Sequence, residues 1–367
     1  MSLFYIVLQF FGVFAVRLPF AKPESFNTVG GLLTISIFSA LAVVLALGFR
    51  EKGKNWFGFW ENTGRAWRTL AVIFAFVVIL TVNFVYAWVG LLVGLLVYMI
   101  FQVALSKTFA VKSLLTPLVL LIISVSVLMI QLVFPFMSLR SYLSFNLPFE
   151  VRLDYTTARP VLVGVISEKP VLGSGPNTFT YSFSKYRDQS FNLTPFWNAR
   201  FDKAPSEAAE MLTGTGILGL LAFEILSAIF IVYGFVFLFR IKDPETWNIG
   251  LAAFSGFLVL WSAHWFFFFN TVLSFSFWLL LAIVMALTRV AGGEKIDTTE
   301  FSFTTSPRRM VSLVSGVSLA LVLVIVFVFF ASAVYASDIF FRKGLLNSGN
   351  PETFEAAQRN FEKAIRL

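Results

Sequence analysis

The sequence predicts an all-α, polytopic integral membrane protein with about nine transmembrane helices, a long extracytoplasmic loop and a helical-repeat tail. Three observations predict this class. The chain of 367 residues is 58% hydrophobic and only 13% charged, whereas soluble domains average about 25% charged residues. Apolar runs of roughly the length that crosses a bilayer recur along the chain. Lys and Arg gather in alternate short loops between these runs.

The expected spans are the apolar runs at residues 3–18, 29–49, 67–82, 84–105, 113–137, 211–239, 248–268, 271–288 and 311–336. The stretch from Thr69 to Leu105 is too long for one span, so we expect it to break near the polar Asn83. The first run is short and ends at Arg17 and Pro19. It therefore also fits a signal anchor or an interfacial helix.

The orientation follows from the basic residues of the short loops. These residues are Arg50, Lys52, Lys54, Arg65, Arg68, Lys107, Lys112, Arg240, Lys242, Arg289, Lys295, Arg308 and Arg309. Loops rich in Lys and Arg stay in the cytoplasm, so the long loop and the C-terminus are expected on the outer face. The same bias accounts for the net charge of +8, and we therefore expect no nucleic-acid partner.

The chain divides into four expected segments. They are N-terminal transmembrane helices (1–137), an extracytoplasmic loop domain (138–206), C-terminal transmembrane helices (207–337) and the start of a tetratricopeptide-like repeat (338–367). The sequence has no cysteine and one histidine, which excludes thiolate and His-rich metal sites. We accordingly expect no metal and no cofactor.

The long loop is expected to fold rather than to be disordered, because it is rich in aromatic residues and disordered segments are poor in them. "TARPVLVGVISEK" from Thr157 has apolar residues at helical spacing, and "PVLGSGPNTF" after it predicts a glycine-rich turn. Gly173 and Gly175 also fit a turn whose amides bind a phosphate, but a helix-ending turn is the simpler interpretation.

The tail has two amphipathic helical patterns that are separated by "NSGNP". Its ending, "AAQRNFEKAIRL", resembles the second helix of a tetratricopeptide repeat. Such repeats stack on neighbours to bury their apolar faces, so they would recruit a protein partner. The alternative is a lone amphipathic helix at the membrane surface.

Two motifs in fixed order carry a family resemblance. The first contains Pro170, Leu172, Gly173, Gly175, Pro176 and Phe179, and the second is "GILGLL" at Gly216–Leu221. Earlier, "SFNTVGGL" at Ser25–Leu32 and "AWVGLLVG" at Ala87–Gly94 match two further family stretches. Together they resemble the O-antigen ligase/polymerase family of membrane glycosyltransferases. The family has a histidine, usually followed by Asn, before "GILG", and here Pro205 and Ser206 stand there. The family also has an arginine three residues before the tryptophan, where this chain has Val85.

The resemblance implies transfer of a glycan from a polyprenyl-diphosphate carrier to an acceptor on the outer face of a prokaryote's cytoplasmic membrane. The partners would be the lipid-linked glycan and membrane lipid. Because the family's histidine and arginine are unmatched, a non-catalytic scaffold that binds glycan or lipid is the second hypothesis. A transporter of lipid-linked sugars is the third, although no duplicated halves are visible in the sequence.

Several charged residues are candidates for this chemistry. The expected diphosphate-binding residues are Arg159, Arg187, Arg200 and Lys203, because cations must hold the leaving group. Glu207 is the expected catalytic base, although an acid at this position also suits an ordinary helix start. His264 is the other catalytic candidate. Glu224 lies about 20 Å along a continuous helix from Met211, so we expect it not to pair with His264 and to be structural.

Overall fold

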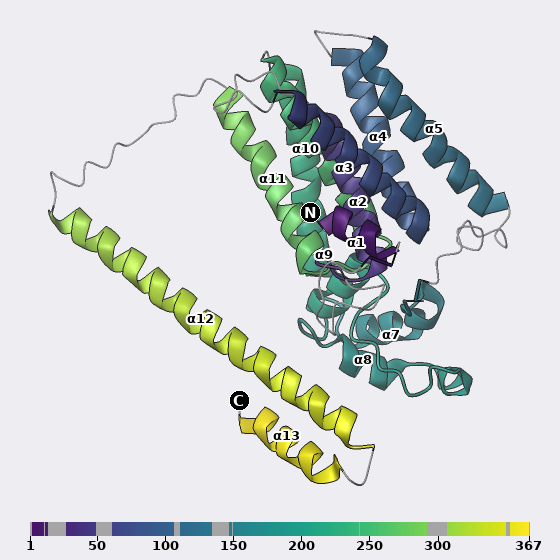
Figure 1. The fold of residues 1–367 in the computed structure, drawn as a ribbon, viewed down its shortest axis with the longest axis vertical. Coiled ribbons are helices and arrows are strands. Elements are labelled where there is room, and N and C mark those ends of the chain that lie inside the picture. The colour runs from purple at the N-terminus through teal and green to yellow at the C-terminus, as the bar shows by residue number, and fades with distance from the viewer. Residues whose placement is uncertain are drawn as a thin grey trace. The chain divides into compact units, whose positions relative to one another are not determined.

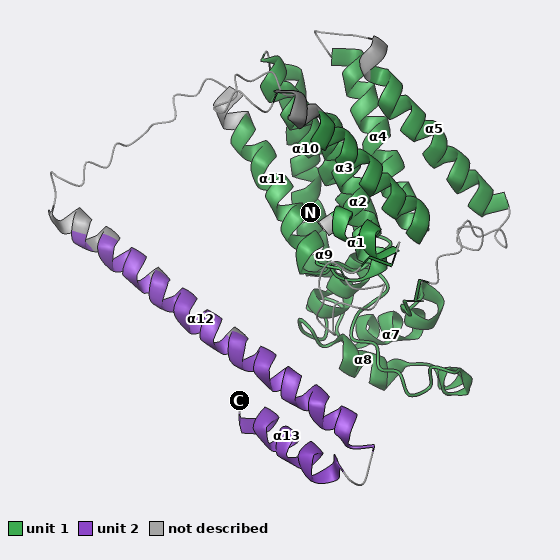
Figure 2. Cartoon of the chain, viewed as in Figure 1, with its two compact units in different colours: residues 1–296 green, residues 297–367 purple. Residues whose placement is uncertain are grey.

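The computed structural model describes residues 2–10, 12–13, 27–48, 61–105, 111–133, 147–148, 150–241, 243–291, 307–349 and 353–366. These residues form helices joined by turns and extended segments, with no strand among them. The chain divides into two compact units, residues 1–296 and 297–367 (Figure 2). The expected all-α class is therefore confirmed for the described residues.

The first unit holds most of the helices (Figure 1). They are α1 (Ser2–Phe10), α2 (Leu32–Gly48), α3 (Glu61–Val82), α4 (Val85–Leu105), α5 (Val111–Val133), α7 (Tyr155–Glu168), α8 (Phe179–Tyr186), the 3-10 helix η2 (Gln189–Leu193), α9 (Glu207–Arg240), α10 (Pro244–His264) and α11 (Thr271–Ala291). The second unit contains α12 (Pro307–Asn347) and α13 (Phe354–Arg366).

Five described helices are long and apolar enough to cross a membrane. They are Val85–Leu105, Leu114–Val133, Glu207–Arg240, Pro244–His264 and Val314–Asn347, and shorter apolar helices occupy Leu32–Gly48, Ala66–Val82 and Thr271–Leu287. The chain thus has the helices of a membrane protein, but the described residues do not establish nine spans. Several predictions of the sequence analysis concern positions outside the described residues: residues 11 and 14–18 of the first run, the loop residues 138–146, and the basic residues Arg50, Lys52, Lys54, Lys107, Lys242 and Lys295.

The centre of the bundle is the packing of α2, α4 and α10, and glycines allow these helices to approach closely. A Cβ on Gly48 would lie 2.1 Å from the Ala252 Cβ, and one on Gly94 would lie 2.5 Å from the Val259 Cγ2. In a membrane, helix association depends on such close packing because lipid tails are as apolar as the side chains. The two glycines of "GLLVG", Gly90 and Gly94, therefore lie at a close contact with α10.

The expected break at Asn83 is also confirmed. α3 ends at Val82 and α4 begins at Val85, with Asn83 at φ 50° between them. The Asn83 side-chain oxygen accepts hydrogen bonds from Trp88 Nε1 at 3.1 Å and from Gln131 Nε2. This turn therefore joins α4 and α5 through a side chain as well as reversing the chain.

Residues 150–206, which we call the loop domain, fold around their own aromatic core. Asp154 begins α7 by accepting a hydrogen bond from Thr157 N. The buried residues of this core are Leu153, Ala158, Val161, Phe179, Phe183, Phe191 and Ala204, together with Ala209 of α9. α7 and α8 lie together at one end of the first unit's bundle (Figure 1). The helix and the glycine-rich turn that the sequence predicts are both present.

The loop domain is joined to α9 at a break in that helix. Gly216 has φ 71° and ψ −171°, which interrupts the helix. Two amides of the turn after α7 donate to carbonyls before the break: Ser174 N to Thr213 O at 2.8 Å, and Gly175 N to Gly214 O at 3.0 Å.

After the break the donors lie on α9 and the acceptors on the turn. Ile217 N donates to Pro170 O at 2.9 Å, and Leu218 N donates to Val171 O at 3.3 Å. A broken helix leaves amides and carbonyls without partners, which is costly in a membrane protein unless another segment binds them. The 170–175 turn provides those partners. We call these four hydrogen bonds the interlock.

In the second unit, α12 and α13 form a helical pair. The ring centres of Phe341 and Phe361 lie 5.6 Å apart, and Ser337 Oγ donates a hydrogen bond to Ala364 O at 2.6 Å. α12 runs without interruption through residue 337, where the sequence analysis placed a boundary. The assignment to a tetratricopeptide repeat stays a prediction.

The interlock predicts a strong requirement for glycine at position 216. A Cβ there would lie 2.2 Å from the Val171 carbonyl oxygen, and the backbone conformation is one that side chains disfavour. We expect Gly216→Ala to lower the free energy of unfolding in detergent by at least about 2 kcal/mol. Gly316→Ala is the control, because nothing lies within 4 Å of its Cβ position. Equal stability of the two variants would contradict the interlock.

Candidate functional site

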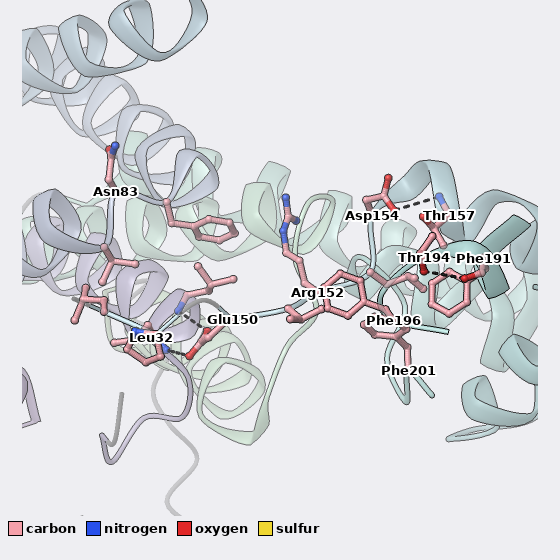
Figure 3. A pocket seen from close by; sticks show the side chains of 17 residues that line it. Leu32, Asn83, Glu150, Arg152, Asp154, Thr157, Phe191, Thr194, Phe196 and Phe201 are labelled. Atoms are coloured by element: carbon pink, nitrogen blue, oxygen red, sulfur yellow. Dashed lines mark hydrogen bonds between the residues drawn. The ribbon is translucent and has the colours of Figure 1, made fainter. Parts of the chain in front are cut away.

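A pocket of about 610 Å³ opens where the loop domain meets the bundle (Figure 3). Phe191, Phe196 and Phe201 of the loop domain line one part of it. Leu32 at the start of α2 and Phe84 at the start of α4 line another. The pocket therefore combines aromatic side chains of the loop domain with helix ends of the bundle.

Two acids of the pocket are already bound by helix N-termini. Glu150 accepts hydrogen bonds from the Leu32 and Leu33 amides, the latter at 3.1 Å, and Asp154 accepts one from the Thr157 amide at 3.2 Å. Desolvation raises the pKa of Asp154, but the hydrogen bonds from Thr157 outweigh it, so this pKa lies below its ordinary value. Both carboxylates thus have their charge compensated by amides.

Arg152 lies between these acids and has a different environment. Its guanidinium carbon lies 5.0 Å from the centre of the Tyr86 ring and 5.5 Å from that of Phe84. Among the described residues, no carboxylate lies within the 4.0 Å of an ion pair with it. The Arg152 charge is therefore supported by aromatic faces and is available to an anion.

The sequence analysis missed Arg152. The signal that could have found it is the alternation in "EVRLD", where Glu150, Arg152 and Asp154 occupy every second position. Residues two apart in an extended segment point to the same side. All three charged residues line the pocket, as do Val151 and Leu153 between them. An acid–base–acid alternation between apolar residues indicates a segment with one polar side.

The four cations that the sequence predicts for substrate binding do not line this pocket. Arg159 and Arg200 are exposed, and Lys203 is half-buried. The guanidinium carbon of Arg187 lies 5.6 Å from the centre of the Phe191 ring, and its Nη1 donates a hydrogen bond to Trp197 O at 3.1 Å. That arrangement holds the 189–197 segment. The role of these four residues in binding stays a prediction.

Glu207 connects the start of α9 to the turn between α10 and α11. Its Oε2 accepts a hydrogen bond from Phe269 N at 2.8 Å, and its amide donates to Phe267 O at 3.1 Å. Glu210 accepts one from Ala204 N at 2.8 Å. Both acids therefore bind backbone amides at this helix start, and the expected role of Glu207 as a base stays a prediction.

The expectation that Glu224 and His264 do not pair was wrong. His264 Nε2 lies 2.7 Å from Glu224 Oε1, and Trp261 Nε1 donates to Glu224 Oε2 at 3.3 Å. The expectation treated α9 as straight from Met211, whereas Gly216 breaks the helix and changes its path. Glu224 therefore lies at the level of His264, which is the last residue of α10.

A single proton on one of the two side chains accounts for the short contact of this pair. His264 Nδ1 lies 2.6 Å from the Trp261 carbonyl oxygen. Because a carbonyl only accepts, Nδ1 must donate to it. Nε2 is then a donor to a carboxylate if the ring is charged, or an acceptor from a protonated Glu224 if it is neutral. Either way the pair shares one proton. His264 is fully buried, whereas the Glu224 side chain is 20% exposed.

Tyr155 connects this region to the loop domain. Its hydroxyl donates to Trp265 O at 2.6 Å and lies 2.5 Å from Ser206 Oγ. Burial raises the pKa of Tyr155, so the phenol remains a neutral donor. Ser206 Oγ also accepts from Ala209 N at 3.1 Å and thereby begins α9. Ser206 thus has a structural role at the start of α9.

The comparisons with known proteins assign no family. No protein-family model matches the chain, and a search of curated proteins finds no match. Within the described residues, no group of three or more His, Cys, Asp or Glu side chains is placed to hold a metal ion. Any functional conclusion therefore rests on the site itself.

The Glu224–His264 pair predicts strong coupling between the two residues. Removing one partner of a buried ion pair costs about 3–5 kcal/mol, so Glu224→Leu and His264→Leu should each destabilise the protein by several kcal/mol. The double variant should lose clearly less free energy of unfolding than the two single variants lose together, because it leaves neither partner buried without the other. Unfolding in detergent measures this, with the exposed Glu245→Leu as the control. Additive losses would show that the two side chains do not interact.

Proposed function

We propose that the protein transfers a polyprenyl-diphosphate-linked glycan to an acceptor hydroxyl, in the manner of O-antigen ligases. The reaction would occur at the loop-domain end of the bundle, on the outer face of the cytoplasmic membrane of a prokaryote. The observation that supports this most is Arg152, a guanidinium without a carboxylate partner among the described residues, in a pocket between the loop domain and helix ends.

The pocket has the chemistry that a lipid diphosphate requires. It adjoins the first residues of α2 and the turn between α3 and α4, which is where a helix that crosses a membrane meets the headgroup region. An arginine can bind phosphate oxygens with two parallel hydrogen bonds. Because Glu150 and Asp154 are bound to amides, they compete less for the guanidinium than free carboxylates would.

The transfer needs a proton acceptor as well as a cation. The acceptor oxygen forms a bond to the anomeric carbon, and the bond from that carbon to the diphosphate breaks, with its electron pair leaving on the diphosphate. The hydroxyl proton goes to a base. Glu207 is the base that the sequence predicts. Glu224, whose side chain is 20% exposed, is the alternative, with the buried His264 as its partner.

The second candidate is a non-catalytic scaffold that binds lipid-linked glycan. It is favoured by Pro205 and Ser206, which stand where the family that the sequence resembles has a histidine, usually followed by Asn; here the Ser206 hydroxyl begins α9 instead. Binding at Arg152 is common to both candidates, and transfer belongs to the first alone. A transporter of lipid-linked sugars was the third hypothesis, and no further observation supports it.

The proposal predicts that Arg152→Gln weakens binding of a short-chain polyprenyl diphosphate. A hydrogen bond to a charged group contributes ~1.5–3 kcal/mol, so we expect a loss of at least about tenfold in affinity. Titration of the purified protein in detergent measures this. Arg240→Gln, at the opposite end of α9, should bind like the wild type. If Arg152→Gln binds normally while Arg200→Ala and Lys203→Ala do not, the site predicted from the sequence is the correct one.

A further inference from the structure

A second pocket of about 250 Å³ lies on the loop domain. It is formed by the C-terminal half of α7, the glycine-rich turn and α8, and its lining includes Glu168, Ser174, Thr178, Tyr181 and Lys185. None of its lining residues belongs to the Arg152 pocket. Its polar side chains and its exposed aromatic ring suggest a ligand with both hydroxyl groups and an apolar face.

An ion pair stands at the edge of this pocket. Lys185 Nζ lies 2.6 Å from Glu168 Oε2, and the two side chains are 58% and 50% exposed. The hydrogen bond from Lys185 lowers the pKa of Glu168, so the carboxylate stays charged. An exposed pair of this kind adds little to stability. It does present an acceptor beside a donor, an arrangement that two neighbouring hydroxyls of one ligand can bind.

Tyr181 supplies an aromatic surface beside the pair. It is 78% exposed although it lies on the same helix as the buried Phe179 and Phe183. Tyrosine is amphipathic, and its ring can cover the apolar face of a ligand while its hydroxyl stays in water. A ring with one apolar face and several hydroxyls is the structure of a pyranose sugar.

The floor of the pocket is a row of hydrogen-bonded hydroxyl groups, those of Ser174, Thr178 and Ser182. Ser174 Oγ lies 2.7 Å from Thr178 Oγ1, and Ser182 Oγ donates to Ser174 Oγ at 3.2 Å. Ser174 Oγ also donates to Thr213 O at 3.0 Å. These contacts use the hydroxyl protons and leave oxygen lone pairs, so the floor can accept hydrogen bonds from a ligand. Ser174 also belongs to the interlock, which fixes the floor to α9.

From these features we infer that the pocket binds one neutral pyranose unit of a glycan. Its volume is below the range of about 300–1,000 Å³ that drug-sized ligands occupy, and a single sugar ring is correspondingly small. The apolar face of the sugar packs on Tyr181, and adjacent hydroxyls bind Glu168 and Lys185. The role of the pocket as a subsite for the glycan substrate rests on the proposed function, whereas the binding of a sugar there does not.

The position of the pocket indicates what length of glycan would use it. Glu168 and Asp154, which lines the Arg152 pocket, are fourteen residues apart along α7, or ~21 Å at 1.5 Å per residue. A monosaccharide cannot reach both pockets. The subsite therefore holds a sugar that is several units away from the reacting end, and it favours oligosaccharides over single sugars.

The test uses the full chain in detergent and the methyl glycosides of glucose, galactose, mannose and N-acetylglucosamine, with binding followed by saturation-transfer NMR. At least one glycoside should bind the wild type, and Tyr181→Ala should weaken its binding by up to about tenfold. Glu168→Gln should also weaken it. Trp197→Ala is the matched control, because Trp197 is a 59% exposed aromatic residue of the same domain outside this pocket.

Two results would overturn the inference: no binding of any glycoside to the wild type, or equal effects of Tyr181→Ala and Trp197→Ala. Melting temperatures close to that of the wild type would show that the variants fold. Arg152→Gln separates this inference from the proposed function, because it should keep full glycoside binding. If the diphosphate binds without Arg152 while glycoside binding still depends on Tyr181, the proposed donor site fails and the sugar subsite remains.

Discussion

The arrangement of the first unit depends on the interlock, the four backbone hydrogen bonds between the 170–175 turn and the broken helix α9. A helix break in a membrane protein exposes amides and carbonyls that need partners. Here the partners come from the loop domain, so the same bonds that complete α9 also hold the loop domain on the bundle. Gly173 and Gly216 allow this contact, with φ of 66° and 71° and no Cβ to separate the two backbones.

Both pockets and the proton-sharing pair depend on this contact. The turn fixes the C-terminal end of α7, while the Tyr155 hydroxyl fixes its N-terminal end to Trp265 O. Arg152, just before α7, is thereby held above Phe84 and Tyr86. The floor of the sugar pocket contains Ser174 of the same turn. Beyond the break, the new path of α9 brings Glu224 to His264.

Much of the fold was predictable from the sequence because its signals are local. The break at Asn83, the α7 helix, the turn after it and the close packing at "GLLVG" all follow from single residues or short periodic patterns. The Glu224–His264 pair was not predictable in this way. It depends on a helix break that only a partner segment stabilises, and nothing near Gly216 in the sequence shows that partner.

The candidate site was less predictable than the fold. The sequence drew attention to cations next to the expected membrane span, such as Arg200 and Lys203, and the structure leaves both outside the Arg152 pocket. Arg152 itself lies more than fifty residues before α9 and adjoins α2 and α4 only through tertiary packing. The glycine-rich turn at 170–175 and the "GILGLL" stretch appear in the sequence as separate features, and the structure shows that their backbones are hydrogen-bonded to each other.

The most direct test of this account is amide hydrogen exchange of the wild-type protein in detergent, at residue resolution, across the interlock. The amides of Ser174, Gly175, Ile217 and Leu218 donate its four hydrogen bonds. They should exchange slowly and with a common opening free energy, because all four bonds must break when the loop domain detaches. Fast exchange at Ser174 and Gly175, with α9 still protected on both sides of Gly216, would contradict the account.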